Sequence, residues 1–408
     1  VKDIRETISL CASRFYKNPS QNSLCIGITG TNGKTSVSWI ISELLNKLGK
    51  PSSQIGTLGF RSSKSEIKEN PNTTPEPIAL YSFMQEEMEL GTEAFVIEAT
   101  SQGLVQKRTA DLAWDMAIFT NLTRDHLDLH ETLEAYALAK KSLFSEELAK
   151  SSKDKKQAIV NLDNAFGQLL AEELKLTLPE INCLTYSEEN KDADIFLESA
   201  EKSAHGTEIK VSILEKSISL KTKLVGAYNV SNVLASVAAV SALGYSLEDI
   251  SKAIQVVDSI PGRLDLVAES KIPVFVDYAH TPDALTAVQE SLKELNPKRL
   301  ITVFGCGGDR DRGKRALMAE AVATASDIAI VTSDNPRTED PEQILADVVT
   351  GFPDNSISHE VIADRQKAIY HAIGIAEEGD LVLVAGKGHE DYQEIQGVRH
   401  AFDDKEVC

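Results

Sequence analysis

A glycine-rich segment at residues 29–36 carries a lysine and a threonine at the spacing used to bind phosphate groups. Glycines let backbone N–H groups curl around phosphate oxygens, while Lys34 supplies a positive charge and Thr35 a hydroxyl that can bind magnesium. The common pattern GxxxxGK(S/T) has glycine where this chain has Ile28, so the segment is a variant, and a chance glycine-rich turn is the alternative. We predict an ATP-phosphate loop formed by Gly30, Thr31, Asn32, Gly33, Lys34, Thr35 and Ser36.

Two other segments place metal-binding side chains directly after strand-like runs. Glu98 ends a short apolar run, and the segment Asn121–His126 follows the run Met116–Phe119. Ligands of α/β proteins bind at the carboxyl ends of parallel strands, and carboxylate oxygens with an imidazole suit the Mg²⁺ that accompanies ATP. Alone, either residue is more often a capping or surface residue. Their order after a phosphate loop favours a magnesium site that includes Thr35, Glu98 and His126.

Lys140 falls by its spacing on an apolar helical stripe. The stripe consists of Leu133, Tyr136, Ala137, Leu143, Phe144 and Leu148. Such a lysine either extends its ammonium group to solvent along the apolar surface, or is desolvated. Desolvation lowers the pKa of a lysine and leaves a neutral amine that can react. The spacing alone leaves both interpretations open.

Short β-branched runs alternate with helical patterns along the whole chain. After the strand-like run Leu24–Ile28, apolar residues recur at helical spacing from Val37 to Leu48. Strands that alternate with helices are typical of parallel α/β sheets, and we predict two of them. A polar, alternating segment at 191–223 predicts a small antiparallel element on the first domain. Other predicted strands are Ala94–Ile97, Met116–Phe119, Val274–Val276, Leu300–Phe304, Ile328–Val331 and Leu381–Val384.

The length of the chain predicts more than one domain. A chain of 408 residues is too long for one ordinary core, so two or three domains are expected. The stretch Ser259–Gly262 is the most hinge-like, and the alternation of strands and helices resumes after it. We therefore predict a first domain at residues 1–260 and a second at residues 261–408.

The composition is that of an acidic globular protein. The formal net charge is −20 at pH 7, a charge that repels nucleic acid and anionic membranes, so we expect neither as a partner. The five cysteines show no paired or zinc-binding spacing, which indicates free thiols in a reducing compartment. The smoothest apolar stretch, Val230–Leu247, is interrupted by Asn232 and serines. We predict a packed helix there, no membrane span, no secretory signal and a cytoplasmic location.

The pattern Gly27-x-x-Gly-Thr-Asn-Gly-Lys-Thr35 resembles the ATP signature of the Mur ligases and of the related folylpolyglutamate synthetases. These enzymes use ATP to join a carboxylate to an amine through an acyl phosphate. The resemblance extends over nearly the whole chain. It implies an α/β fold in which a central P-loop ATPase domain precedes a Rossmann-like C-terminal domain. It also implies ATP as co-substrate, Mg²⁺ as cofactor, and catalytic roles for Lys34, His126, Lys140 and Arg263.

The resemblance adds a specific role for Lys140. Tyr136-Ala-Leu-Ala-Lys140 resembles the family motif whose lysine reacts with CO₂. The resulting carbamate is an anion that bridges to a magnesium site, which implies Lys140 as a further metal ligand. Four more ATP contacts are implied as well: two asparagines near the adenine, an arginine on the terminal phosphate and an aspartate on the ribose. In this chain they are Asn229, Asn232, Arg263 and Asp277.

A tetrapeptide in the second domain resembles the one found in the Mur ligases that add meso-diaminopimelate. It is Asp334-Asn-Pro-Arg337, although Asn-Pro is also common in ordinary turns. Diaminopimelate carries a second carboxylate that lysine lacks, and an arginine can clamp it with two parallel hydrogen bonds. Glu390 could bind the distal ammonium. The residues implied to bind diaminopimelate are Arg310, Asp334, Asn335, Arg337, Gly386 and Glu390.

The acceptor implied by the resemblance is a UDP-linked muramoyl dipeptide. Its contacts would be Asn72, Thr73, Thr74, Thr100, Ser101 and Arg108. Family members of this kind begin with a separate domain that holds the uridine diphosphate. Fewer than about 30 residues precede the phosphate loop here, too few for a domain, so we expect this chain to lack it.

The sequence therefore predicts a monomeric enzyme with small-molecule substrates, which adds meso-diaminopimelate to the glutamyl carboxylate of the muramoyl dipeptide. A folylpolyglutamate synthetase would share the loop and the reaction type but not the trio Arg310, Arg337 and Glu390. A lysine-adding ligase is disfavoured by Arg337 alone. A non-catalytic ATP-binding protein is disfavoured by the presence of Lys34 and Lys140, among others.

Overall fold

The structure is a computed structural model that describes residues 3–62, 64–65, 68–123, 127–214, 216–268, 271–353 and 357–408. The chain divides into two compact units. The first comprises Val1–Glu201, Glu208–Thr222 and Tyr228–Val257, and the second Lys202–Thr207, Lys223–Ala227 and Asp258–Cys408. Both units are built on sheets with mostly parallel strands, which confirms the predicted α/β class. The domain limits 1–260 and 261–408 remain a prediction.

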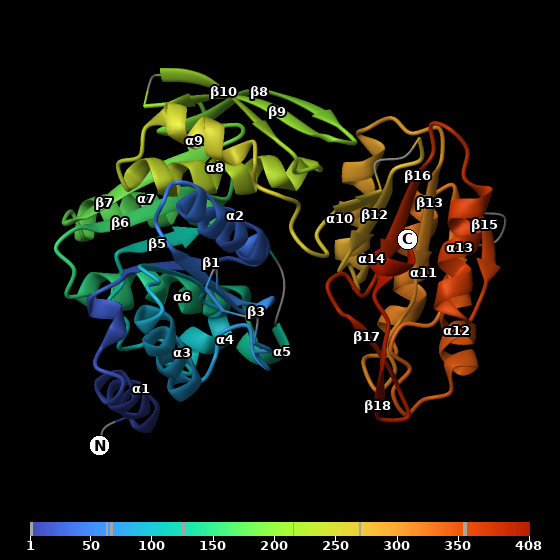
Figure 1. Ribbon diagram of the computed structural model, residues 1–408, viewed down its shortest axis with the longest axis horizontal. Coiled ribbons are helices and arrows are strands. Elements are labelled where there is room, and N and C mark those ends of the chain that lie inside the picture. The colour runs from blue at the N-terminus through green and yellow to red at the C-terminus, as the bar shows by residue number, and fades with distance from the viewer. Residues whose placement is uncertain are drawn as a thin grey trace. The chain divides into compact units, whose positions relative to one another are not determined.

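The first unit contains a ten-stranded sheet in the order β10-β9-β8-β7-β6-β5-β1-β4-β2-β3 (Figure 1). In this sheet order, every neighbouring pair of strands from β8 through β2 is parallel. The edge strand β3 is antiparallel to β2. The segment 191–223, predicted to form a small antiparallel element, contains β8, β9 and β10, which extend this sheet. The strands are β1 Leu24–Thr29, β2 Ser52–Gly56, β3 Gly59–Ser62, β4 Ala94–Glu98, β5 Met116–Phe119, β6 Lys156–Asn161, β7 Ile181–Ser187, β8 Ile195–Ser203, β9 Gly206–Ile213 and β10 Lys216–Thr222.

The position of β1 brings the predicted functional segments together. β1 lies between β4 and β5 and is parallel to both, with Ile28 opposite Glu98 and Thr29 opposite Phe119. The carboxyl ends of the three strands therefore meet at one edge of the sheet, where α/β proteins bind their ligands. The phosphate loop, Glu98 and the segment after β5 all leave the sheet at this edge.

Helices pack against both the sheet and one another in this unit. α2 contacts β1, β2 and β4, and its apolar stripe is fully buried from Val37 to Leu45, as its spacing predicts, while Leu48 follows the helix and is half-buried. The predicted packed helix at 230–247 is α8, which ends earlier, at Ala242. The helices are α1 Ile4–Phe15, η1 Pro19–Gln21, α2 Lys34–Lys47, α3 Pro77–Glu89, α4 Ser101–Val105, α5 Leu127–His130, α6 Leu133–Ser142, the π-helix η2 Leu143–Leu148, α7 Ala165–Thr177, α8 Ala227–Ala242 and α9 Leu247–Ile254.

The second unit contains a six-stranded sheet in the order β11-β12-β16-β13-β14-β15, in which only β11 is antiparallel to its neighbour (Figure 1). A separate hairpin joins β17 to β18. The strands are β11 Asp265–Ala268, β12 Val274–Asp277, β13 Leu300–Phe304, β14 Ile328–Val331, β15 Ser358–Val361, β16 Leu381–Ala385, β17 Tyr392–Ile395 and β18 Val398–Ala401; the helices are α10 Pro282–Lys293, α11 Lys314–Ala325, α12 Pro341–Val349, α13 Arg365–Ile375 and α14 Asp404–Val407.

Local patterns located the central strands closely. Met116–Phe119, Leu300–Phe304 and Ile328–Val331 have the predicted bounds, and the other predicted strands extend by one residue at the carboxyl end. None of the helices within the described ranges combines the length and apolar character needed to cross a membrane.

A buried ion pair ties the last helix to the core of the second unit. The guanidinium of Arg365 donates to both carboxylate oxygens of Asp404, at 2.7 and 2.6 Å, and to the carbonyl of Ala385 at 3.0 Å. Both charged side chains are 0% exposed. Removing one partner leaves an uncompensated buried charge, which is far more destabilising than loss of an exposed pair.

We predict that Asp404→Ala lowers the free energy of unfolding by about 3–5 kcal/mol, because Arg365 then stays buried without its counter-ion. Urea unfolding should be followed by far-UV circular dichroism, since both tryptophans, Trp39 and Trp114, lie in the first unit. The matched control is Glu378→Ala, which breaks an exposed 3.2 Å pair with Lys271 and should leave the unfolding midpoint unchanged. Equal effects of the two variants would contradict a structural role for the buried pair.

Candidate functional site

The phosphate loop is held to the segment that follows β5. The backbone N–H of Thr31 donates to the carbonyl of Asn121 at 2.9 Å, and that of Asn32 to the Asn121 Oδ1 at 2.8 Å. Lys34 Nζ bonds to the carbonyls of Gly30 and Thr31 at 2.9 and 2.8 Å. The lysine charge is therefore fixed over the loop, beside the start of α2, where phosphate groups are attracted to helix N-termini.

The asparagines predicted to lie near the adenine adjoin this loop. Gly33 caps α2 with a left-handed φ of 85°, and a Cβ there would lie 2.5 Å from Asn232 Oδ1. Only glycine accommodates both the backbone conformation and this close approach. Asn232 in turn donates from Nδ2 to Asn229 Oδ1 at 3.0 Å. The structure thus brings this predicted pair to the phosphate loop, and it buries Ser36 in the first turn of α2.

Glu98 is a fully buried carboxylate at the carboxyl end of β4. Its Oε2 accepts from Thr35 Oγ1 at 2.9 Å, so the predicted metal ligands Thr35 and Glu98 are in contact. Thr57, which the sequence analysis missed, donates to Glu98 from its backbone N–H at 2.9 Å and from its hydroxyl at 3.2 Å. Its position one residue after β2, at the same edge of the sheet, is the signal that could have identified it.

The oxygen donors at this edge suit Mg²⁺. Thr35 supplies a hydroxyl and Glu98 a carboxylate next to the loop that faces phosphates, and such hard oxygen ligands are what Mg²⁺ takes together with phosphate oxygens and water. Within the described part of the chain, no group of three or more His, Cys, Asp or Glu side chains forms a metal cage. The predicted ligand His126 lies outside the described residues.

Lys140 is buried, not extended to solvent. Its side chain is 1% exposed, and Nζ donates to the carbonyl of Gly30 at 2.7 Å. The ammonium also lies 4.1 Å from the centre of the Tyr136 ring. The alternative in which Lys140 extends its ammonium group to solvent is therefore wrong. The helix places this lysine directly against the phosphate loop.

A second buried carboxyl supports the helix that carries Lys140. α6 continues into η2, where Glu147 accepts from Trp114 Nε1 at 2.9 Å and from the Thr109 hydroxyl at 2.9 and 3.1 Å. Burial of the group raises the pKa of Glu147 to about 7, although these hydrogen bonds oppose the shift. η2 also contacts β5.

Residues predicted to bind the acceptor form a hydrogen-bonded cluster next to Glu98. Thr74 and Thr100 hydroxyls lie 2.8 Å apart, and Thr74 Oγ1 donates to the carbonyl of Glu98 at 2.7 Å. Arg108 Nη1 donates to the carbonyl of Thr74 at 2.6 Å, while its Nε lies 3.0 Å from Glu76. The cluster therefore adjoins the metal-binding edge described above.

The remaining acceptor residues connect to the same edge in different ways. The Thr73 hydroxyl lies 3.2 Å from that of Thr57, which bonds to Glu98. Ser101 Oγ lies 2.9 Å from the Nε2 of buried His130, a residue that the sequence analysis missed because its partner lies 29 positions away. Asn72 is half-buried, and its backbone N–H donates to Asn70 Oδ1 at 3.4 Å.

In the second unit, Asp334 and Asn335 are buried between the end of β14 and the loop after β16. Asn335 Nδ2 donates to Glu390 Oε2 at 2.8 Å. Gly386 has a φ of 119°, and a Cβ there would lie 2.6 Å from Asp334 Oδ2, so glycine permits the close approach of the two segments. Four of the six residues predicted to bind diaminopimelate thus lie together.

Arg337 extends the same patch. Its φ is 52°, its Nη1 donates to the carbonyl of Gly308 at 2.8 Å, and its Nε lies 3.6 Å from Glu394 Oε2. β17 runs along this segment: Arg337 N donates to the Glu394 carbonyl at 3.0 Å, and Gln393 Nε2 to the Asp334 carbonyl at 2.7 Å. Arg310 is exposed, and no hydrogen bond within the described structure ties it to the patch.

The predicted ATP contacts of the second unit lie at the end of β12. Asp277 is buried, and its carboxylate accepts the backbone N–H groups of Leu264 and Ala279 at 2.7 and 2.8 Å. The guanidinium of Arg263 lies 5.0 Å from the centre of the Tyr278 ring. Asp277 thus fixes the turn that carries Arg263, a structural role that does not require a ligand.

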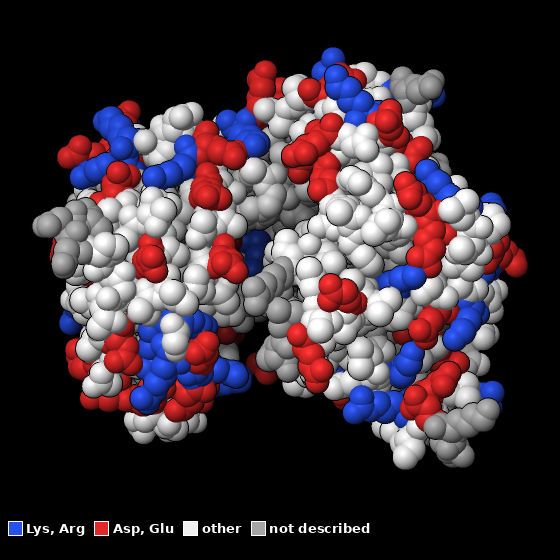
Figure 2. All heavy atoms as spheres, turned by 180° about the vertical axis from the view of Figure 1, so that it is seen from behind, with Lys and Arg blue, Asp and Glu red and all other residues white. Residues whose placement is uncertain are grey.

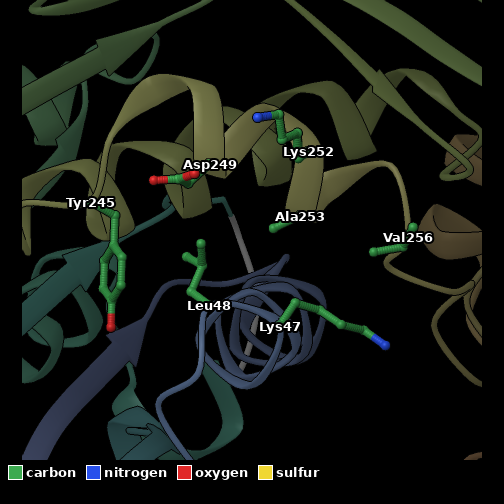
Figure 3. A pocket seen from close by; sticks show the side chains of 7 residues that line it. All are labelled: Lys47, Leu48, Tyr245, Asp249, Lys252, Ala253 and Val256. Carbon is green, nitrogen blue, oxygen red and sulfur yellow. The ribbon is translucent and has the colours of Figure 1, made fainter.

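A hollow of about 570 Å³ in the first unit is separate from these residues. It is lined by Lys47 at the end of α2, by Leu48 directly after it, and by five residues at or near α9 (Figure 3). Its charged side chains do not converge: Lys252 pairs with Glu248 at 2.6 Å, and Asp249 accepts from the Ser246 hydroxyl at 2.6 Å. On the face that Figure 2 shows, acidic and basic side chains are interspersed.

Two family models match the chain. The Mur ligase middle domain matches residues 28–240, and the Mur ligase glutamate ligase domain matches residues 262–388. The UDP-N-acetylmuramoyl-L-alanyl-D-glutamate--2,6-diaminopimelate ligase of Pseudomonas putida is 42% identical over 411 residues, which cover 99% of this chain and 81% of the relative. The two chains are thus similar along nearly the whole of this one.

Solved structures show the same similarity. A UDP-N-acetylmuramoyl-L-alanyl-D-glutamate--2,6-diaminopimelate ligase is 36% identical with a TM-score of 0.73, over 98% of this chain and 82% of the other. Folylpolyglutamate synthase of Mycobacterium tuberculosis, solved with ADP and AMPPCP, has a TM-score of 0.73 over 93% of this chain and 92% of the other. At 17% identity, this second match reflects a shared fold alone.

The raised pKa of Glu147 predicts a stability difference that depends on pH. The carboxyl ionises near pH 4.5 in the unfolded chain and near pH 7 in the folded protein, so the folded state loses stability as the pH rises through this interval. The loss amounts to about 3 kcal/mol above pH 7. Glu147→Gln removes the titration, and we expect the variant to exceed the wild type in stability at pH 8 but not at pH 4.5.

Urea unfolding at both pH values measures this difference. Glu134→Gln, at an exposed position of α6, is the control for loss of one negative charge. A difference between Glu147→Gln and the wild type that is the same at pH 4.5 and pH 8 would show that Glu147 does not titrate in this range.

Proposed function

Because the chain belongs to the Mur ligase family, we propose that it uses ATP to add meso-diaminopimelate to UDP-N-acetylmuramoyl-L-alanyl-D-glutamate. The relative from Pseudomonas putida and the solved structure at 36% identity both carry the name of this ligase. The structural observation that supports diaminopimelate as the amine is the patch formed by Asn335, Arg337 and Glu390. Asn335 bonds to Glu390, and Arg337, two residues after Asn335, bonds to the carbonyl of Gly308. The patch offers a carboxylate for an ammonium group and a guanidinium for a carboxylate.

The first step proposed is phosphoryl transfer. The glutamyl carboxylate of the acceptor attacks the γ-phosphorus of ATP, the bond to ADP breaks, and an acyl phosphate forms. Lys34 and Arg263 would offset the negative charge that develops on the phosphoryl oxygens. Thr35, Glu98 and His126 are proposed to hold Mg²⁺, which when bound supplies positive charge to the phosphates. Gly30, Thr31, Asn32, Gly33 and Ser36 would contribute the surrounding loop.

Lys140 is proposed to complete this site as a carbamate. Its amine adjoins the carbonyl of Gly30, so a carboxylate attached to Nζ would stand beside the phosphate loop. The carbamate would turn a buried cation into an anionic metal ligand. Asn229, Asn232 and Asp277 are proposed to bind the nucleoside of ATP, and the acceptor is proposed to bind through Asn72, Thr73, Thr74, Thr100, Ser101 and Arg108.

The second step proposed is aminolysis. The α-amine of diaminopimelate attacks the acyl carbon, the amide bond forms, and inorganic phosphate leaves with the electron pair of the broken C–O bond. Arg337 and Arg310 would bind carboxylates and Glu390 the distal ammonium, while Asp334, Asn335 and Gly386 shape the site. Holding both reactants in place would supply much of the acceleration. We further propose that the chain acts as a monomer in the cytoplasm.

Three alternatives differ from this proposal in a single measurable property. A folylpolyglutamate synthetase would use a folate acceptor, but the similarity to one is limited to 17% identity. A lysine-adding ligase would prefer L-lysine to diaminopimelate. A non-catalytic ATP-binding protein would release no phosphate with any amine.

Phosphate release from ATP is the decisive test. With Mg²⁺ and UDP-N-acetylmuramoyl-L-alanyl-D-glutamate present, we expect release that depends on meso-diaminopimelate and that L-lysine does not support at equal concentration. The tripeptide product should appear in equal amount, which mass spectrometry would verify. No release with either amine, under conditions where ATP binds, would contradict the proposed function and leave the non-catalytic alternative and the folate-using one, which the same assay with a folate acceptor would separate.

Arg337 should decide between the two amines. We expect Arg337→Met to raise the KM for meso-diaminopimelate by about 10- to 100-fold, because a charge-assisted pair of hydrogen bonds to the distal carboxylate is lost. The KM for L-lysine, measured at the much higher concentrations needed for release with this amine, should change little because L-lysine has no such carboxylate. Arg312→Met, which removes an exposed arginine paired with Glu339 at 2.9 Å, is the control. A similar rise for both amines would contradict the assignment of Arg337 to the distal carboxylate.

A further inference from the structure

Lys387 places a fully buried ammonium group beside the proposed diaminopimelate site. The residue is 0% exposed and lies in the loop between β16 and β17. Its Nζ donates to Asn335 Oδ1 at 3.1 Å and lies 3.3 Å from Glu390 Oε2. A buried charge is destabilising unless it is paired and hydrogen-bonded, and both partners here are residues proposed to form the amino-acid site.

The orientation of the Asn335 amide follows from its neighbours. The backbone N–H of Glu394, which can only donate, points at Oδ1 at 2.9 Å and so identifies that atom as the oxygen. Nδ2 is therefore the atom that donates to Glu390 Oε2 at 2.8 Å. Lys387 and Asn335 thus both direct hydrogen atoms at one oxygen of the Glu390 carboxylate.

Two donors on one oxygen fix the plane of the carboxylate. Glu390 keeps 20% of its side-chain surface exposed, so a ligand can still reach the group. Both donors use Oε2, so Oε1 takes no part in these two contacts and is the oxygen proposed to bind an incoming cation. A carboxylate held in this way loses little conformational freedom when it binds an ammonium group.

We propose that Lys387 is a positioning residue that holds Glu390 in place for the distal ammonium of diaminopimelate. The assignment rests on the proposed function. The positive charge of Lys387 repels a ligand ammonium, but an ammonium bound at Oε1 would lie nearer to the carboxylate than to Lys387. Coulomb attraction to the nearer carboxylate exceeds that repulsion, so the ammonium still binds Glu390, and the contribution proposed for Lys387 is to hold the carboxylate in position.

A pair of substrates separates positioning from general structural support. 2-Aminopimelate keeps the reacting amine, its carboxylate and the distal carboxylate of diaminopimelate, and lacks only the distal amine. If Lys387 acts through Glu390 on that amine, Lys387→Met raises the KM for meso-diaminopimelate and leaves the KM for 2-aminopimelate unchanged. Methionine is apolar and close in volume, so it suits a buried position.

Steady-state phosphate release should be measured for the wild type and Lys387→Met with each amine. We expect the KM for meso-diaminopimelate to rise by about 10- to 100-fold, the loss of one charge-assisted hydrogen bond to a carboxylate. The KM for ATP should stay constant, which verifies that the variant folds. Lys387→Gln, which keeps a donor without the charge, should show a smaller rise and replaces the methionine variant if that one does not fold. Lys367→Met, at a 77% exposed lysine of α13, is the control.

Each outcome decides the proposal. A rise confined to meso-diaminopimelate supports the positioning role. Equal rises for both amines, or no rise for either, overturn it while leaving the ligase function intact. No release by the wild type with either amine overturns the proposed function and, with it, this role of Lys387.

Discussion

The buried carboxylate of Glu98 is the constraint on which the first unit depends. It lies at the end of β4 without solvent contact, and an unsatisfied charge there would be destabilising by several kcal/mol, on the order of the whole stability of a domain. Thr35 at the start of α2 and Thr57 after β2 donate to it, and its backbone carbonyl accepts from Thr74. Glu98 thereby holds three separate segments, two through its carboxylate and one through its backbone carbonyl, at the edge where β1 leads into the phosphate loop.

The same edge shows why parts of the site were predictable and others were not. The phosphate loop and Glu98 follow from local patterns, since a strand-like run precedes each of them. Thr57 follows a strand, but no local pattern shows that this strand lies beside β4, and His130 carries no local signal. Their roles arise from contacts with Glu98, 41 positions away, and with Ser101, 29 positions away. Such contacts depend on strand order, which periodicity does not specify.

Lys140 illustrates the intermediate case. The helical stripe predicted correctly that the residue lies among apolar neighbours, and left open whether the ammonium reaches solvent. The answer depends on the position of α6 beside the loop that follows β1, which brings the Gly30 carbonyl within 2.7 Å of the amine. Lys387 in the second unit is similar: its glycine-flanked segment was identified as part of the site, but the lysine was given no role because burial of its charge is visible only in the structure.

The charged groups of both proposed sites are already bound to neighbouring groups. Lys34 donates to the carbonyls of its own loop, and Glu390 accepts from Asn335. A phosphate that binds at the loop would therefore replace carbonyl contacts of Lys34, in a geometry that the loop has already fixed. For Glu390 the contacts can persist, because they use one oxygen and leave the carboxylate accessible. Preorganisation reduces the conformational entropy lost on binding, so affinity at each site depends as much on these internal bonds as on the ligand contacts themselves.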